Sequence, residues 1–170
     1  QVNHSTNDVQ FNASLNKELN YQGEPDGPYV TQLSNGSIRI EAVSQSGLTR
    51  RTYDQVPSKG IKVDLPGELG SFNVQLNEGV TPPPYQYDKP TQFFVTSDFE
   101  GNIEALVYML VQAGIMDKEY NWTYGSGHLY LLGYPIARGS YVTDSLWLFH
   151  QLKNQKKRGW GDGTFPCGKH

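Results

Sequence analysis

Two short apolar runs separated by a helical pattern constrain the fold of this chain more than any other feature. The first run, residues 93–96, ends in the polar stretch of residues 97–102. Apolar side chains then recur at three- and four-residue intervals, which is typical of one buried helix face; they are Ile103, Leu106, Val107, Leu110 and Val111. The second run, residues 128–133, leads into residues 134–139. The pattern predicts a β-α-β unit whose two strand ends face one site, because ligands gather at the carboxyl ends of strands in open α/β sheets.

The residues after the first run resemble a motif of the calcineurin-like metallophosphoesterases, G-D-x-H-G-N. The chain keeps Asp98, Gly101 and Asn102 of this motif, but Ser97 replaces its first Gly and Glu100 replaces its His. The similarity covers roughly the second half of the chain. It is closest to secreted or periplasmic bacterial members, so the resemblance implies a secreted or periplasmic location.

The residues after the second run resemble the next motif of the same family, G-D-x-x-D-R-G. The chain keeps Gly133, Arg138 and Gly139, whereas Tyr134 and Ala137 stand where the family has its two Asp residues. The resemblance therefore implies the scaffold of the family together with an incomplete active site.

The departures concern the metal chemistry that the resemblance implies. The family uses two divalent metals, Mn, Fe or Zn, which share a bridging carboxylate and activate a water. Tyr134 stands at the bridging position, and a neutral phenol with a pKa near ~10 is a poor substitute for a carboxylate. Asp98 and Glu100 remain as weak oxygen ligands. The family's third motif, G-N-H-E, is absent before His170, so we expect no tightly bound metal.

Arg138 corresponds to the arginine with which the family grips phosphate, so a phosphate-containing ligand is expected there. The alternative is that Arg138 pairs with Asp98 or Glu100 once no metal neutralises them. Two functions follow from the resemblance. The first is a degenerate family member without efficient hydrolysis. The second is an active metal-dependent phosphomonoesterase or protein phosphatase, completed by an unusual site or by another chain. Whether the chain is an enzyme stays open at this point.

The first half of the chain has a different pattern. Residues 1–27 are rich in Asn, Gln and Ser and are interpreted as a loose arm. Alternating strands are predicted in residues 28–78, with Asn35-Gly36 as a hairpin signal, and they indicate a small sandwich-like antiparallel domain. Residues 79–90 contain three consecutive prolines and are predicted to be a linker. The fold class is therefore α+β, with a partial α/β domain in residues 91–170.

Composition excludes some partners. A formal net charge of -3, from 14 basic and 17 acidic residues, gives no case for nucleic acid or for an anionic membrane. No apolar stretch reaches the roughly 18 residues that a membrane span needs. The β-α-β unit stops with the chain at His170, so we expect an unpaired sheet edge, remedied by homo-oligomerisation or strand exchange. The Gly-rich residues 159–170 lack periodicity, and an eroded or frameshifted end is one hypothesis for them.

Overall fold

The structure, a computed structural model, describes residues 24–44, 46–76, 86, 89–133 and 138–160. Most of the predicted arm and most of the predicted linker therefore lie outside the described residues, as do Tyr134 and Ala137. The described part is a mixed α+β fold with an antiparallel N-terminal sheet and two α-helices.

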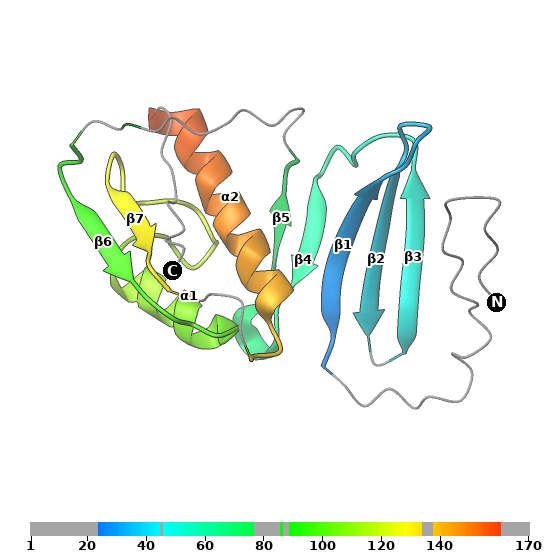
Figure 1. Ribbon diagram of the computed structural model, residues 1–170, viewed down its shortest axis with the longest axis horizontal. Helices are drawn as coiled ribbons and strands as arrows, with labels where there is room; N and C mark the ends of the chain where they lie inside the picture. The colour runs from blue at the N-terminus through cyan, green and yellow to red at the C-terminus, as the bar shows by residue number, and fades with distance from the viewer. Residues whose placement is uncertain (1–23, 45, 77–85, 87–88, 134–137, 161–170) are drawn as a thin grey trace.

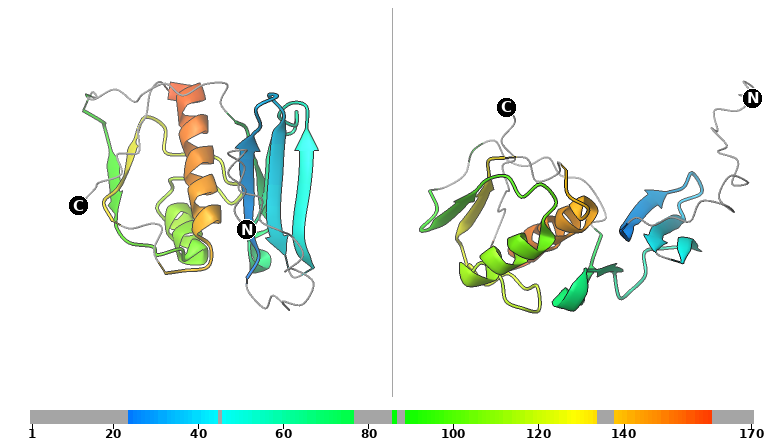
Figure 2. Two further views of the ribbon diagram at one scale, coloured as in Figure 1. Left: turned by 45° about the vertical axis from the view of Figure 1, so that its right-hand side comes forward. Right: turned by 90° about the horizontal axis from the view of Figure 1, so that it is seen from below.

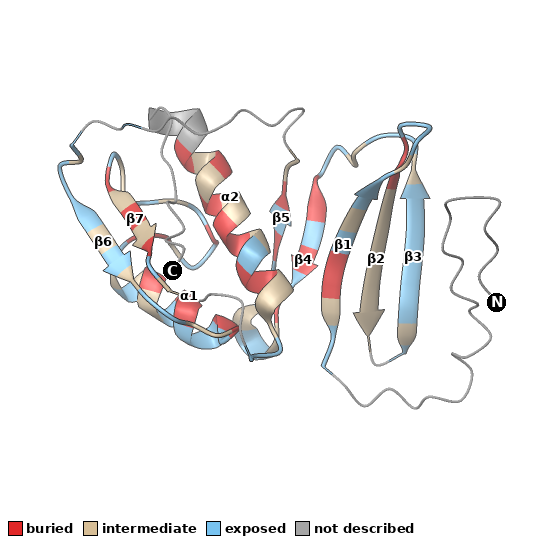
Figure 3. Cartoon of the chain, in the orientation of Figure 1, coloured by how far each residue is buried: buried red, intermediate tan, exposed pale blue. Residues whose placement is uncertain are grey.

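The N-terminal sheet contains three antiparallel strands in the order β1-β2-β3. They are β1 (Asp26–Gln32), β2 (Ile38–Ser44) and β3 (Gly47–Tyr53). The predicted hairpin at Asn35-Gly36 is confirmed, since Gly36 has a φ of 87° and the Asn35 side chain accepts a hydrogen bond of 3.0 Å from the Ser37 backbone N–H. Positive φ is the conformation for which glycine is selected in such turns. Figure 3 shows that β3 is largely exposed.

A separate hairpin follows the sheet. It pairs β4 (Ile61–Asp64) with β5 (Ser71–Val74), and the short 3-10 helix η2 (Gly67–Leu69) lies between the two strands. The alternate residues Val63, Phe72 and Val74 are buried, and they share one hydrophobic core with residues of the later helices. The hairpin thus packs against the second half of the chain.

The predicted β-α-β unit is present. The strand β6 (Phe93–Thr96) leads to α1 (Ile103–Gln112) and then to β7 (His128–Leu131), which pairs with β6 in parallel. The Asn102 side chain caps α1 by accepting a hydrogen bond of 3.0 Å from the Ala105 backbone N–H. Such a cap satisfies one of the unpaired donors at a helix start.

The second helix, α2 (Val142–Trp160), lies between the N-terminal sheet and the β6–β7 pair (Figure 1). The views in Figure 2 show α1 beside α2 and the three-stranded sheet on the far side of α2. A hydrogen bond of 2.8 Å from the Trp147 indole N–H to the Pro28 carbonyl joins α2 to β1. Among the described residues, no helix has the length and apolar character needed to span a membrane.

The core confirms the predicted face of α1 and corrects that of α2. Ile103, Leu106, Val107 and Leu110 are buried, as their spacing predicts. For α2 the sequence predicts a buried face of Leu146, Trp147, Phe149 and Leu152, but Leu146 is 49% exposed, whereas Leu148 is fully buried. Four consecutive large apolar residues, 146–149, hide the helical period, so the sequence does not select the buried face. The proposed domain boundaries stay a prediction.

Candidate functional site

The carboxyl ends of β6 and β7 meet at one edge of their two-stranded sheet. The parallel register pairs Thr96 with Leu131, and the Leu132 backbone N–H donates a hydrogen bond of 2.9 Å to the Thr96 carbonyl. Residues 97–102 therefore leave the sheet beside Gly133. We call residues 97–102 the first loop, and we call the described residues 133 and 138–141 the second loop. Residues 134–137 are outside the described part of the chain.

Two glycines allow the loops to approach each other closely. A Cβ atom at Gly133 would overlap the Asp98 carboxylate and would lie 2.7 Å from its backbone nitrogen. A Cβ atom at Gly139 would overlap the Glu100 carbonyl oxygen and would lie 2.7 Å from the carbonyl carbon of Gly101. A side chain at either position would force the loops apart. These glycines therefore fix the distance between the two predicted motifs.

The first loop contacts the second again just before α2. The Tyr141 backbone N–H donates a hydrogen bond of 3.3 Å to the Gly101 carbonyl. Gly101 itself has a φ of 74°, a conformation that L side chains rarely adopt. The starts of α1 and α2 are thus held at the same end of the molecule as the loops.

Arg138 and Glu100 face each other across the two loops. Their side chains form an ion pair of 3.7 Å between Arg138 Nε and Glu100 Oε1. Both residues have positive φ, 66° for Arg138 and 50° for Glu100, which is uncommon for residues other than glycine. The predicted alternative, in which Arg138 pairs with a carboxylate of the first motif, is confirmed for Glu100.

This ion pair is exposed to solvent. The Arg138 side chain is 83% exposed and that of Glu100 is 44% exposed. Pairs of this kind typically contribute about 0–1 kcal/mol, because solvent screens them and ordering two long side chains costs entropy. Arg138 is therefore available to an incoming anion at little cost.

Asp98, the other predicted oxygen ligand, lies on the first loop next to Gly133. Ser97 Oγ donates a hydrogen bond of 3.4 Å to Asp98 Oδ1. Sequence analysis placed Asp98, Glu100 and Arg138 near one sheet edge, and the structure brings all three to that edge. The predicted substitutions at Tyr134 and Ala137 have no described positions.

Comparison with known proteins gives a specific result. No protein-family model matches the chain, and no curated protein matches it. Three solved structures do. All three are cold-active protein tyrosine phosphatases. The enzyme of the psychrophile Shewanella sp. is 26% identical with a TM-score of 0.64, and the match covers 84% of this chain and 42% of that one.

The other two matches are similar in extent. A structure described at 1.1 Å resolution is 26% identical with a TM-score of 0.65, covering 84% of this chain and 41% of that one. A point mutant is 27% identical with a TM-score of 0.63, covering 82% and 41%. The chain thus spans about two-fifths of the length of the structures that it matches.

These matches correct the family suggested by the two motifs. The similar structures are described as protein tyrosine phosphatases and not as calcineurin-like metallophosphoesterases, so the predicted family is wrong. The resemblance depended on a few Gly, Asp, Asn and Arg residues after two strands. Such residues suit many ligand-binding strand ends, because glycine allows close approach and the polar side chains contact the ligand.

The expected metal chemistry needs the same correction. The two divalent metals, Mn, Fe or Zn, followed from the metallophosphoesterase resemblance alone. Within the described ranges, no group of three or more His, Cys, Asp or Glu side chains is arranged to hold a metal ion. Asp98 and Glu100 are only two such groups, and Glu100 already pairs with Arg138. Because the similar structures are protein tyrosine phosphatases, the two-metal chemistry implied by the metallophosphoesterase resemblance is wrong.

Sequence reasoning missed a second group of charged residues. Asp144, in the first turn of α2, is 3% exposed, although nothing in its neighbourhood in the sequence singles it out. Burial raises the pKa of Asp144 to about 6, and the negative charge of Asp26 adds to this increase. A hydrogen bond from the backbone N–H of Asp144 to its own carboxylate opposes the increase. An acidic residue beside an apolar run is the only sequence signal, and many exposed helix starts share it.

Proposed function

We propose that the first and second loops bind the phosphate group of a phosphorylated substrate, and that the chain is the phosphate-binding part of a phosphatase-like protein. The observation that carries the proposal is the close contact of the two loops, which brings Arg138 to the carboxyl ends of β6 and β7. The similarity to protein tyrosine phosphatases supports the same function.

Arg138 supplies the positive charge for this binding. A guanidinium stays charged at neutral pH and presents a planar set of donors that fits two phosphate oxygens. A hydrogen bond to a charged group contributes about 1.5–3 kcal/mol. The exposed pair with Glu100 contributes about 0–1 kcal/mol. Phosphate therefore competes successfully with Glu100 for Arg138.

The start of α1 favours an anion at the same place. Helix α1 begins at Ile103, directly after the first loop, and it is 10 residues long. Its dipole places partial positive charge at this end, and phosphates frequently bind there. The carboxylates of Asp98 and Glu100 oppose this effect, so we expect weak binding of free phosphate.

The similar structures support one substrate class. They are described as protein tyrosine phosphatases, and we extend the proposal to a phosphotyrosine side chain of a protein or peptide. Both loops are on the surface, and Arg138 is exposed, so a side chain projecting from a partner protein can reach the site.

Binding without turnover is the second candidate function. In this case the chain binds the phosphate group and hydrolyses it inefficiently, as the sequence predicts. The Arg138–Glu100 pair favours it, because a carboxylate that stays beside Arg138 reduces the charge available to a transition state. Assaying p-nitrophenyl phosphate turnover separates the two candidates. A rate equal to that in buffer supports binding alone, and saturable turnover supports the phosphatase.

Calorimetric titration of the protein with O-phosphotyrosine measures the binding itself. We expect the Arg138→Ala variant to bind roughly tenfold or more weakly than the parent, because a charge-assisted hydrogen bond is lost. Arg51→Ala is the matched control, since Arg51 is an exposed arginine on β3 in the N-terminal sheet. Equal affinity of the parent and the Arg138→Ala variant would remove Arg138 from the site.

A further inference from the structure

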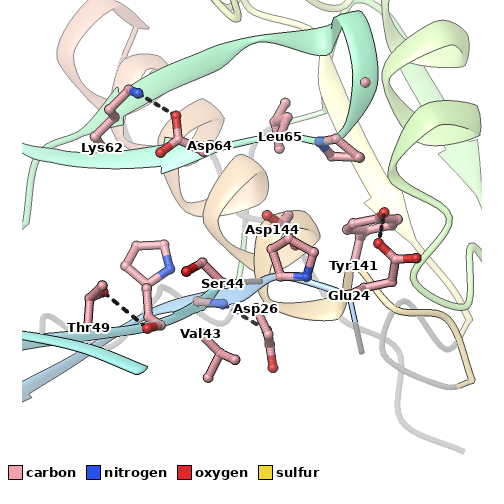
Figure 4. A pocket seen from close by; sticks show the side chains of 16 residues that line it. Glu24, Asp26, Val43, Ser44, Thr49, Lys62, Asp64, Leu65, Tyr141 and Asp144 are labelled. Atoms are coloured by element: carbon pink, nitrogen blue, oxygen red, sulfur yellow. Dashed lines mark hydrogen bonds and ion pairs between the residues drawn. The ribbon is translucent and has the colours of Figure 1, made fainter. Parts of the chain in front are cut away.

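A pocket lies between the N-terminal sheet and the start of α2. Its volume is about 450 Å³, and residues of β1, β2, β4, the β4–η2 connection and α2 line it. Figure 4 shows Glu24, Asp26 and Asp144 around one end of the pocket, while Lys62 and Asp64 lie across it on β4. The pocket is separate from Arg138, which does not line it.

The described lining of the pocket is mainly acidic. Among the described residues that line it, four carry carboxyl groups, Glu24, Asp26, Asp64 and Asp144, and one carries an amine, Lys62. Lys62 is already paired with Asp64. Two of the other carboxylates accept hydrogen bonds from tyrosines, Glu24 from Tyr141 and Asp26 from Tyr29. These bonds orient the two carboxylates.

Asp144 is the exception, because one of its oxygens has no hydrogen-bond partner among the described residues. That oxygen, Oδ2, is buried, and Asp144 as a whole is 3% exposed. Buried polar groups in folded proteins are nearly always paired, since an unpaired one loses its hydration without compensation. A buried, unpartnered carboxylate oxygen in the wall of an acidic pocket is complementary to a cationic ligand.

The pocket fits an organic cation better than a metal ion. Among the residues that the structure describes, no three His, Cys, Asp or Glu groups are placed to hold a metal. The volume far exceeds that of a single ion and suits a group of side-chain size. Part of the wall is apolar, formed by Pro25, Pro28, Val43 and Leu65, and can cover an alkyl stem.

We propose that this pocket binds the ammonium or guanidinium end of an alkyl cation, with Asp144 as its counter-ion. The ligand class is a basic amino-acid side chain or a free alkyl amine or guanidine of the same size. The cation donates to Asp144 Oδ2, while Asp26 and Glu24 contribute negative potential. This site shares Tyr141 with the second loop but does not include Arg138, and its ligand carries no phosphate.

Calorimetric titration with agmatine, a free alkyl guanidine, tests the proposal at about pH 8, where Asp144 is ionised. We expect saturable binding by the parent and roughly ten- to hundredfold weaker binding by the Asp144→Asn variant, because a buried charge-assisted hydrogen bond is lost. Asp54→Asn is the matched control, since Asp54 lies after β3 outside this pocket. Its affinity should equal that of the parent.

Further probes distinguish a peptide side chain from a free amine as the ligand. A second variant covers the case in which the first variant does not fold. N-butylurea has an alkyl stem of the same length as that of agmatine and ends in a neutral urea group, so it carries no charge and should not bind. Tighter binding of an acetylated arginine methylamide than of agmatine assigns the pocket to a peptide, and the reverse order assigns it to a free amine. If Asp144→Asn fails to fold, Asp26→Asn should weaken agmatine binding several-fold. Equal binding of agmatine and its neutral analogue, or no agmatine binding by the folded parent, overturns the proposal.

Discussion

We expect two side chains, Arg138 and Glu100, to determine the affinity of the proposed phosphate site. Each lies at a loop position with positive φ, and their ion pair is long and exposed. In the proposed site Glu100 competes with the ligand, because its carboxylate pairs with the guanidinium that a phosphate would contact. Removing its charge should therefore strengthen anion binding, opposite to the effect of removing Arg138.

The Glu100→Gln variant tests this competition. We expect it to bind phosphotyrosine about two- to fivefold more tightly than the parent, since an exposed pair contributes at most ~1 kcal/mol. Glu119→Gln is the control, because Glu119 is an exposed residue in the turn before β7. Calorimetry measures both affinities. Weaker binding by Glu100→Gln would show that Glu100 orients Arg138 instead of competing with its ligand.

Because the carboxyl group of Asp144 is buried, we expect the stability of the protein to depend on pH. Its pKa in the folded protein is raised from 3.8 to about 6, chiefly by burial and then by Asp26. As the pH rises, the unfolded chain therefore loses the Asp144 proton at a lower pH than the folded protein does. The resulting contribution of Asp144 to the free energy of unfolding is fully present below about pH 4 and is lost as the pH rises through about 6. The folded and unfolded pKa values of Asp144 differ by roughly 2, which corresponds to ~3 kcal/mol in the free energy of unfolding. The other groups around the pocket, Glu24, Asp64 and Lys62, are common to parent and variant.

Urea denaturation of the parent and the Asp144→Asn variant from about pH 4 to about pH 8 measures this effect. The free energy of unfolding of the parent should fall relative to that of the variant as the pH rises. The fall should be concentrated around pH 6, because that is where the folded protein releases the proton. A constant difference between the two proteins across the range contradicts a raised pKa for Asp144.

Single residues were predictable only where chain order decides their position. Asp98 and Arg138 follow two strands whose parallel pairing brings their ends together, and the hydrophobic pattern indicates those strands. The burial of Asp144 depends on how α2 meets β1 and β4, elements separated from it by many residues. No local pattern contains that information.

At the level of elements, the two loops depend on glycine. A Gly139→Ala change places a Cβ atom on the Glu100 carbonyl oxygen and within 2.8 Å of the Gly101 Cα. We expect a loss of about 1–3 kcal/mol in stability, the usual cost of overpacking. We also expect weaker phosphotyrosine binding, because the loops separate.

Gly114→Ala is the control for this change. Gly114 follows α1 at a φ of 68°, and an added Cβ would meet nothing within 4 Å. Its substitution should lower stability through backbone strain and leave phosphotyrosine affinity unchanged. Urea denaturation and calorimetry measure the two properties. Unchanged stability and affinity in Gly139→Ala would contradict the close contact between the loops.

The elements themselves followed the sequence pattern more closely than their packing did. Alternation and the Asn35-Gly36 turn predicted β1 and β2, and the spacing of Ile103, Leu106 and Leu110 predicted the buried face of α1. The predicted buried face of α2 was wrong at Leu146, because an uninterrupted run of apolar residues shows no helical periodicity. The arrangement of β1–β3 as one sheet and β4–β5 as a separate hairpin depends on contacts with α2, which strand patterns do not report.

At the scale of the whole molecule, one side of the β6–β7 pair is exposed. Phe93 is 64% exposed and Val95 is 45% exposed, and within the described ranges no further strand pairs with either edge of this sheet. Phe93 stacks edge-on against Tyr130 with ring centroids 6.3 Å apart. Exposed apolar side chains on an open strand favour association with another chain. We therefore keep self-association as a prediction.

Sedimentation velocity over a range of protein concentrations tests this prediction. We expect the parent to associate as its concentration rises and the Phe93→Lys variant to associate much less, because a charge on an edge strand opposes pairing. Tyr108→Lys is the control, since Tyr108 is 69% exposed on α1, away from that strand. A parent that stays monomeric at every concentration contradicts the prediction.

The family and the location of the protein show the limits of motif matching at this scale. Short motifs after two strands suggested the wrong family, because the identity of a family depends on the whole arrangement of the chain. The ligand site that they suggested stays a prediction. A secreted or periplasmic location came from the same resemblance and stays a prediction.

The central claim is that phosphate binds between the loops after β6 and β7. Backbone amide NMR during titration with O-phosphotyrosine tests it most directly, because it reports position and affinity together. We predict saturable shifts for the amides of residues 98–102, 133 and 138–141, no shifts in β1–β3, and loss of the response in Arg138→Ala. Shifts confined to other parts of the protein, or an unchanged response in Arg138→Ala, would contradict the proposed site.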